Sequence, residues 1–245
     1  MKRIYYISLL VLFFASCDSP DAIDCLKTSG EVKLATRAVS EFTEVEINGE
    51  FEVIITDTSA YALAIETGEN LEPEITTEVL DGRLVVTNNN TCNWSRSYDL
   101  PKVHISAPNI TFILQNGGGV VKSANALTFP TLGVMSEENS GDFILTLNND
   151  AFNITNNEVS NYYISGVTNK FFIGFYAGDG RCLCGDLVAE YVNVFQRGTN
   201  DMIVNAATTL EGRIISTGNV IYTGSAPSNI NVSEEGLGKL IDKTN

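Results

Sequence analysis

The 245 residues carry 15 basic and 30 acidic side chains and one histidine, a net charge of −15. A surface this acidic repels nucleic acid and anionic lipid, so the composition excludes nucleic acid as a partner. No Pro/Gly/Ser-rich linker or charge block divides the chain, and its length suits one domain behind a short N-terminal segment.

The N-terminus has the pattern of a secretory signal peptide. Lys2 and Arg3 precede an apolar run, Ile4–Phe14, and two small residues then lead into Cys17. The run has 11 residues, which is too short for a membrane-spanning helix. We therefore expect residues 1–16 to be removed, and because they hold two basic and no acidic residues, the net charge changes from −15 to −17.

The stretch Phe14-Ala15-Ser16-Cys17 resembles the lipobox of bacterial lipoproteins. The resemblance implies that the Cys17 thiol is acylated and that Cys17 becomes the new N-terminus. Acyl chains anchor a protein at about 0.8 kcal/mol per buried methylene. We expect an exported protein, lipid-anchored in the cell envelope with residues 17–30 as a tether, at the outer membrane on its periplasmic side or at the cell surface. Asp18 leaves the choice of membrane open, since in some bacteria it retains lipoproteins at the inner membrane.

Four cysteines remain after Cys17, and export makes disulfides available. Cys25 in the tether and Cys92 in a polar stretch both have loop surroundings, so we expect them to pair. Such a bridge would join the tether to the folded body and contribute about 4 kcal/mol in the chain-entropy estimate. Cys182 and Cys184 are two apart on an expected strand and point the same way. No second Cys or His cluster accompanies them, so we expect buried free thiols and no metal or cofactor.

The N-terminal third, residues 31–110, has the alternation and turn signals of β-hairpins. Turn pairs stand at Asn48-Gly49 and Asp81-Gly82. The alternating segments are 39–47, 51–56, 62–66, 84–87 and 103–106. No dozen residues keep helical periodicity, so we predict an all-β chain that begins with antiparallel hairpins.

Glycine or asparagine recurs through residues 111–245 at intervals of 18 to 22 residues, at positions suited to a left-handed turn. The positions are Gly119, Gly141, Asn161, Gly180, Asn200, Gly218 and Gly238. A period this short holds two strands and two turns. We predict a β-helix-like solenoid of two-strand coils of about 20 residues, within one domain over residues 31–245.

Residues two and four places after each turn position alternate with polar ones, and we expect them to face the core. The second places are Val121, Phe143, Tyr163, Cys182, Met202, Val220 and Leu240. The third places are also apolar and should form an outward interaction stripe. These are Ile144, Ile164, Leu183, Ile203, Ile221 and Ile241. Cover by the N-terminal hairpins, a sheet packed on both faces, a partner or self-association surface, and a reversed in/out assignment all remain open.

Several segments together resemble the DUF2807 family, described as an autotransporter-adhesin head or head GIN domain and common in Bacteroidetes lipoproteins. They include Val45–Gly49, Cys92–Trp94, Ser140–Asp142, Gly218–Val220 and Gly236–Leu240. The resemblance implies a β-helix-like superhelix, an architecture shared with pectin lyases, and a role in adhesion, with no catalytic residues to carry over. This chain departs from the family pattern where Asn161 and Asn200 replace glycine and where aliphatics fill the third place.

Catalytic patterns are weak. Glycosidases need carboxylates about 5 to 9.5 Å apart. Asp142 and Asp201 share a column but are three coils apart, about 14 Å at the strand spacing. Asp179 and Asp186 flank Arg181 beside glycines, where acids usually serve turns. The only histidine, His104, has no nucleophile assigned to it by spacing. We therefore expect no enzyme.

Exposed aromatics would suit a binding module better, since they stack on sugar rings or fill a partner's pockets; Tyr162, Phe172, Tyr176 and Phe195 are the candidates. The sequence thus predicts an envelope lipoprotein that acts by binding a glycan or protein ligand, in adhesion or envelope interaction, with self-association left open. The alternatives are a structural scaffold lipoprotein and a β-helix polysaccharide-active enzyme.

Overall fold

The computed structural model describes residues 28–90, 99–137 and 141–244. Cys17, Cys25 and Cys92, with the expected lipidation and disulfide, lie outside these residues. The described residues form an all-β fold, with 67% of them in strands. The elements are β1 (Val32–Arg37), β2 (Glu44–Asn48), β3 (Phe51–Asp57), β4 (Ala62–Gly68), the 3₁₀ turn η2 (Glu72–Glu74), β5 (Ile75–Leu80), β6 (Arg83–Asn88), β7 (Lys102–Ala107), β8 (Phe112–Asn116), β9 (Gly119–Ser123), β10 (Thr131–Glu137), β11 (Gly141–Asn156), β12 (Asn161–Phe175), β13 (Arg181–Gln196), β14 (Met202–Ile214), β15 (Val220–Gly224), β16 (Asn229–Glu234) and β17 (Leu240–Thr244).

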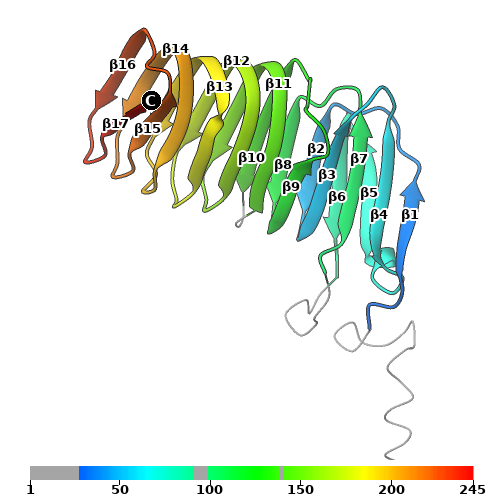
Figure 1. The fold of residues 1–245 in the computed structure, drawn as a ribbon. Helices are drawn as coiled ribbons and strands as arrows, with labels where there is room; N and C mark the ends of the chain where they lie inside the picture. Colours follow the sequence, from blue (N-terminus) through cyan, green and yellow to red (C-terminus); the bar gives the residue numbers. More distant parts are fainter. Residues whose placement is uncertain (1–27, 91–98, 138–140, 245) are drawn as a thin grey trace, which may run out of the picture.

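The strands stack as a β-solenoid of about six turns, with parallel pairs about 20 residues apart, which confirms the predicted fold (Figure 1). Each long strand from β11 to β14 contributes its first half to one sheet and its second half to another. Sheet 1 runs β1, β4, β7, β3, β9, then the first halves of β11 to β14, then β15 and β17. Sheet 2 runs β5, β6, β2, β8, β10, then the second halves of β11 to β14, then β16.

The N-terminal coils do not stack in chain order. The coil formed by β2 and β3 lies between the coil of β6 and β7 and the coil of β8 and β9. Antiparallel pairs occur only at this end of the described chain, where β1 and β7 flank β4 and where β5 pairs with β6. The Asp81-Gly82 hairpin is confirmed, with both residues at positive φ.

The hairpin predicted at Asn48-Gly49 is wrong. The strands on either side, β2 and β3, belong to opposite sheets and pair with neighbouring coils instead of with each other. The Asn116 side-chain amide donates to Asn48 Oδ1 at 3.0 Å, which joins two stacked corners. A turn dipeptide in a solenoid therefore marks a corner as readily as a hairpin.

The core lies between the two sheets and contains stacked aromatic rings. Phe143 and Tyr162 on adjacent coils have ring centroids 5.3 Å apart and nearly parallel planes. Phe152 and Phe171 repeat this contact in sheet 2, at 5.7 Å. All four side chains are buried. Burial raises the pKa of the Tyr162 hydroxyl, which donates to Asn156 Oδ1 at 3.2 Å.

The turn glycines have a different cause from the one predicted. Among the seven turn positions only Gly119 has a positive φ, +101°. At Gly218 the requirement is space, because a Cβ there would lie 2.3 Å from the Asn200 carbonyl oxygen of the preceding coil. The left-handed assignment was therefore wrong for the other positions. Close approach between stacked corners is what excludes a side chain at Gly218.

Cys182 and Cys184 on β13 are buried free thiols, as expected. The Cys182 thiol donates to the Cys184 sulfur at 2.9 Å. Burial raises the pKa of the Cys184 thiol, which keeps it protonated and unreactive. Within the described ranges the structure contains no helix with the length and hydropathy needed to cross a bilayer.

Candidate binding surface

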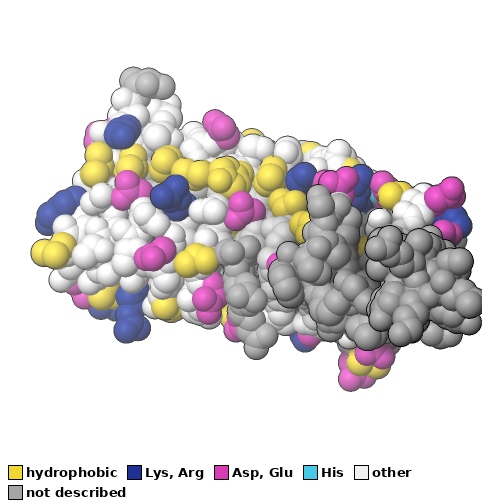
Figure 2. Space-filling model, turned by 90° about the horizontal axis from the view of Figure 1, so that it is seen from below, with side chains coloured by type: hydrophobic (Ala, Val, Ile, Leu, Met, Phe, Trp, Pro, Cys, Tyr) yellow, Lys and Arg dark blue, Asp and Glu magenta, His cyan; other side chains and the backbone are white. Residues whose placement is uncertain are grey.

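A row of outward side chains runs along sheet 1, one from each successive coil. Ile144 pairs in register with Tyr163, and Tyr163 with Leu183. Ile203, Ile221 and Ile241 continue the column. We call these six residues the outer row: Ile144, Tyr163, Leu183, Ile203, Ile221 and Ile241. In Figure 2 a line of hydrophobic side chains follows the length of the stack.

One member of the predicted stripe is wrong. Ile164 is 1% exposed and faces the core, where it pairs with buried Leu145. The error is one residue, because the turn position of this coil is Ser160 and not Asn161, as the pairing of Tyr162 with Phe143 shows. Tyr163, expected in the core, therefore takes the outward place.

The exposure of the outer row differs along its length. Ile144 is 44% exposed and Tyr163 is 41% exposed, whereas Ile221 is only 6% exposed. Leu183, Ile203 and Ile241 are partly buried. The N-terminal strands β4 and β1 extend sheet 1 at its end by edge pairing and do not lie over the row. Partial burial of the inner members is therefore what close neighbours in a stack produce, at about 4.8 Å per coil.

A charged cluster bounds the row toward the N-terminus. Lys122, in register with Ile144, forms an ion pair with Glu52 at 2.9 Å. Further along the sheet, Glu66 accepts from Lys102 at 3.0 Å and contacts His104 Nε2 at 3.1 Å. The hydrogen bond from Lys102, followed by that from His104, lowers the pKa of the Glu66 carboxyl. The outward column of sheet 1 is therefore apolar from β11 to β17, and paired charged residues lie on the N-terminal side of β11.

The acidic residues considered for catalysis accept hydrogen bonds from the neighbouring coil at the corners of the solenoid. Asp142 Oδ1 accepts from the Asn161 backbone N–H at 3.1 Å and from its side-chain amide at 3.0 Å. Asp201 makes the same two contacts with Asn219, at 3.2 and 2.8 Å. Asp179 accepts from the Thr199 hydroxyl. Among the described residues no three His, Cys, Asp or Glu side chains converge as a metal site would require.

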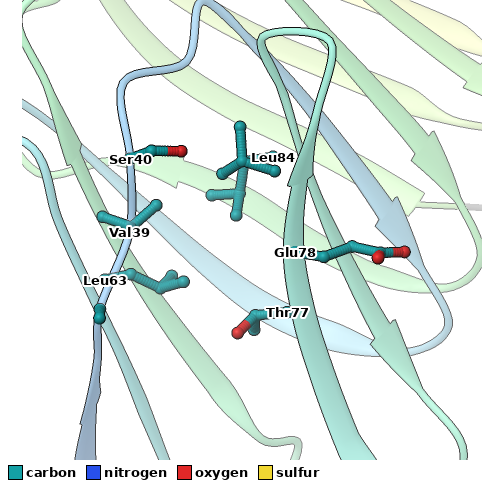
Figure 3. A pocket seen from close by; sticks show the side chains of 8 residues that line it. Val39, Ser40, Leu63, Thr77, Glu78 and Leu84 are labelled. Carbon is teal, nitrogen blue, oxygen red and sulfur yellow. The ribbon is translucent and has the colours of Figure 1, made fainter.

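The hollows in the described part of the structure include volumes from about 130 to about 380 Å³. The cavity in Figure 3, of about 130 Å³, lies at the N-terminal end of the core. Val39, Leu63 and Leu84 point into it, while Glu78 points away. It is an open end of the apolar core, without the convergent polar groups of a ligand site.

The chain matches one protein-family model over most of the solenoid. A family model described as "Putative auto-transporter adhesin, head GIN domain", DUF2807, matches residues 41–226. The chain belongs to this family. The DUF2807 match begins just before β2 and ends just after β15, so it spans the outer row from Ile144 to Ile221.

Several solved structures have a similar fold. A "putative adhesin" from Bacteroides fragilis NCTC 9343 is 21% identical, with a TM-score of 0.79 over 87% of this chain and 98% of that one. A "putative lipid binding protein" from Parabacteroides distasonis ATCC 8503 is 16% identical, with a TM-score of 0.62 over 86% and 97%. A "putative adhesin" from the same strain is 14% identical, with a TM-score of 0.61 over 87% and 97%. At these identities the likeness shows the fold. No curated protein matches the chain.

Within the DUF2807 region, Tyr163 is the outward residue that sequence reasoning missed. A signal for it was present, because Asp142-Phe143 and Asn161-Tyr162 are polar-aromatic pairs 19 residues apart. Aligning these pairs would have placed Tyr162 in the core and Tyr163 on the surface. Among the candidate aromatics, Tyr162 is therefore a core residue, whereas Phe172 and Tyr176 are exposed.

Proposed function

We propose that this DUF2807 protein is an exported lipoprotein, anchored in the outer membrane through acylated Cys17, that acts as a binding module in adhesion. The family description and the descriptions of the structural neighbours support adhesion. The N-terminal lipobox resemblance supports the anchor. The observation that supports a binding role is the outer row, in which Ile144 and Tyr163 are exposed next to each other on adjacent coils.

An apolar row on an acidic protein is costly to leave in water. Scattered apolar residues on a surface need no explanation, but contiguous ones mark interaction sites. With one residue from each coil, the outer row offers a narrow strip along the solenoid instead of a pocket. Such a strip suits a long partner surface that lies along the stack, and we propose that it contacts a glycan or protein of the envelope or of a host surface.

The binding role is tested on glycan and extracellular-matrix arrays with the mature chain, with Ile144→Lys/Tyr163→Lys, and with Leu80→Lys as control. Leu80 is 53% exposed on β5, far from the row. We expect the wild type and the control to bind the same partner and the double variant to bind at least about 10-fold more weakly, the equivalent of about 1.4 kcal/mol.

Circular dichroism must show all three proteins folded, which the outward side chains should allow. Equal binding by the double variant would contradict the outer row as the contact. Absence of binding by the wild type on both arrays would contradict adhesion.

The anchor is tested separately by replacing Cys17 with alanine. The wild type should incorporate labelled palmitate and partition with the outer-membrane fraction, while Cys17→Ala should be unlabelled and leave that fraction. If the wild type is unlabelled, or if both proteins fractionate alike, the lipoprotein proposal is wrong whatever the arrays show.

A further inference from the structure

A second surface, on sheet 2, has the features of a ligand site. A hollow of about 230 Å³ lies over β11, β12 and β13, with Gly174 among its lining residues. Gly174 pairs in register with Thr155 on one side and Phe195 on the other. Because Gly174 has no side chain, the outward column of sheet 2 has a gap between these two neighbours.

The glycine at this place provides room for a ring. Gly174 does not have a positive φ, so its backbone would accept another residue. A Cβ there would lie 2.6 Å from the ring of Tyr176, which leans over the glycine. The ring is the end of a side chain that is 47% exposed, so it can move where a backbone could not. The gap and the ring beside it therefore depend on glycine at 174.

Three aromatic rings line the hollow, Phe172, Tyr176 and Phe195, and Tyr191 packs against Phe172 beside it. Tyr176 and Phe195 have centroids 5.0 Å apart with planes inclined by 31°. Phe172 and Tyr191 have centroids 5.7 Å apart with planes inclined by 54°. Phe172 is 37% exposed and lines the hollow together with Phe195. Aromatic faces carry partial negative charge and attract the C–H groups of a ring that packs on them.

Amides lie beside these rings. Asn153 and Asn193 flank Phe172 in register, on the coils before and after it. Asn193 is held in place, because its amide donates to Tyr191 Oη at 3.3 Å and to Glu211 Oε1 at 3.1 Å. The Asn153 side chain makes no hydrogen bond with any other described residue, so its donor and acceptor are both available to a ligand.

The chemistry of the lining identifies the class of ligand. The hollow is lined by aromatic, aliphatic, amide and hydroxyl groups, and no charged side chain lines it. With no cation present and an acidic protein around it, the hollow disfavours phosphate, sulfate and carboxylate groups. Its volume lies below the usual range of about 300 to 1,000 Å³ for drug-sized ligands. The open surface above it admits one ring of a longer molecule.

We propose that this hollow binds a neutral hexose unit of a glycan, with one face of the sugar packed on Phe172 and its hydroxyls hydrogen-bonded to Asn153 and Asn193. The proposal rests on the chain being a binding module, and it does not depend on the outer row, which belongs to sheet 1. It adds a specific ligand class to the adhesive role.

The test uses the full mature chain in mild detergent and saturation-transfer NMR with the methyl glycosides of glucose, galactose, mannose and N-acetylglucosamine. Gly174→Val places a side chain where the Tyr176 ring now lies, which displaces the ring and changes the shape of the hollow, and valine suits a strand. Phe172→Ala removes the packing face. Leu80→Ala is the control, an exposed apolar side chain on β5 that belongs neither to the hollow nor to the outer row.

We expect the wild type and Leu80→Ala to bind at least one neutral glycoside, with at least a 10-fold loss in both Gly174→Val and Phe172→Ala. Asn153→Ala leaves the backbone and the rings in place and should also weaken binding. This variant keeps the test valid if Gly174→Val does not fold. Absence of binding by the wild type, or wild-type affinity in the folded hollow variants, would overturn the proposal.

The two proposals fail separately. Loss of array binding in Ile144→Lys/Tyr163→Lys, with no glycoside bound by the wild type, would retain the outer row and reject the hexose site. Glycoside binding that is lost in Gly174→Val, with unchanged array binding in the outer-row variant, would do the reverse.

Discussion

Ile144 and Ile164 are the same residue type, so the same substitution at both positions tests which of them faces the core and which faces solvent. Ile144 and Ile164 lie on adjacent coils, and the sequence pattern placed both in the outward stripe. In the structure Ile144 is 44% exposed, while Ile164 is 1% exposed. Replacing each by alanine removes the same three carbons and lowers the β-propensity by the same amount. The difference between the two variants therefore reports burial.

The expected magnitudes follow from these exposures. At Ile164 three buried carbons at about 0.8 kcal/mol each, together with the cavity left behind, place the loss in the range of about 2 to 5 kcal/mol. At Ile144 roughly half of the transfer energy is lost, about 1 kcal/mol, and water fills the space. Ile164→Ala should therefore be less stable than Ile144→Ala by about 1 to 4 kcal/mol.

The measurement is urea unfolding followed by far-UV circular dichroism. The midpoint should fall further for Ile164→Ala, while the slope stays the same for both variants, since a changed slope would indicate partial unfolding of the stack. Equal losses, or a larger loss at Ile144, would refute the register in which Tyr162 pairs with Phe143 and would return Ile164 to the surface.

Three further outcomes are expected from the structure. Gly218→Ala should lower stability by about 1 to 3 kcal/mol in the same urea assay, because its Cβ meets a carbonyl of the neighbouring coil; a neutral effect would contradict the close-approach explanation. Glu235 has a pKa lowered to about 2 by its hydrogen bond from Arg213, so Arg213→Gln should raise that pKa toward 4.5, read from the carboxyl carbon by NMR. A depressed pKa stabilises the fold above pH 4.5 and the effect is lost as the pH falls toward 2, so wild type and variant should differ in stability above that window and converge below it. Cys182 and Cys184 should resist iodoacetamide in the folded protein and react once it is unfolded, as peptide mapping by mass spectrometry would show; labelling of the folded protein would contradict their burial, and a loss of two hydrogens would reveal a disulfide.

The coil period could be predicted from sequence because it is imposed by a repeated local need. At each corner the chain passes close to the corner of the preceding coil, where a large side chain would collide with it. Small residues therefore recur once per coil. This signal gives the period but not the register. In the coil of β12, Ser160 holds the turn position, and the neighbouring Asn161 matched the pattern only because its amide binds Asp142.

The N-terminal arrangement could not be read from the sequence. Alternating strands joined by Asn48-Gly49 satisfy the rules for a hairpin, and the same residues satisfy those for a solenoid corner. The choice depends on which strands lie alongside, and here the coil of β2 and β3 is paired on both sides by strands that come later in the chain. Non-local pairing of this kind leaves no mark on local periodicity.

Binding surfaces on a solenoid are assembled from one residue per coil, so they are the features most sensitive to register. A shift of one residue moves a side chain from water to the core, as it does for Tyr163 and Ile164, and a strand that is apolar on both faces gives no alternation to detect the shift. The hollow at Gly174 shows the same dependence. Its rings and amides come from positions about 20 residues apart, and they become a site only when Asn153, Phe172 and Asn193 stand in register. The stacking that makes this fold recognisable from its sequence is therefore also what determines which residues can meet a ligand.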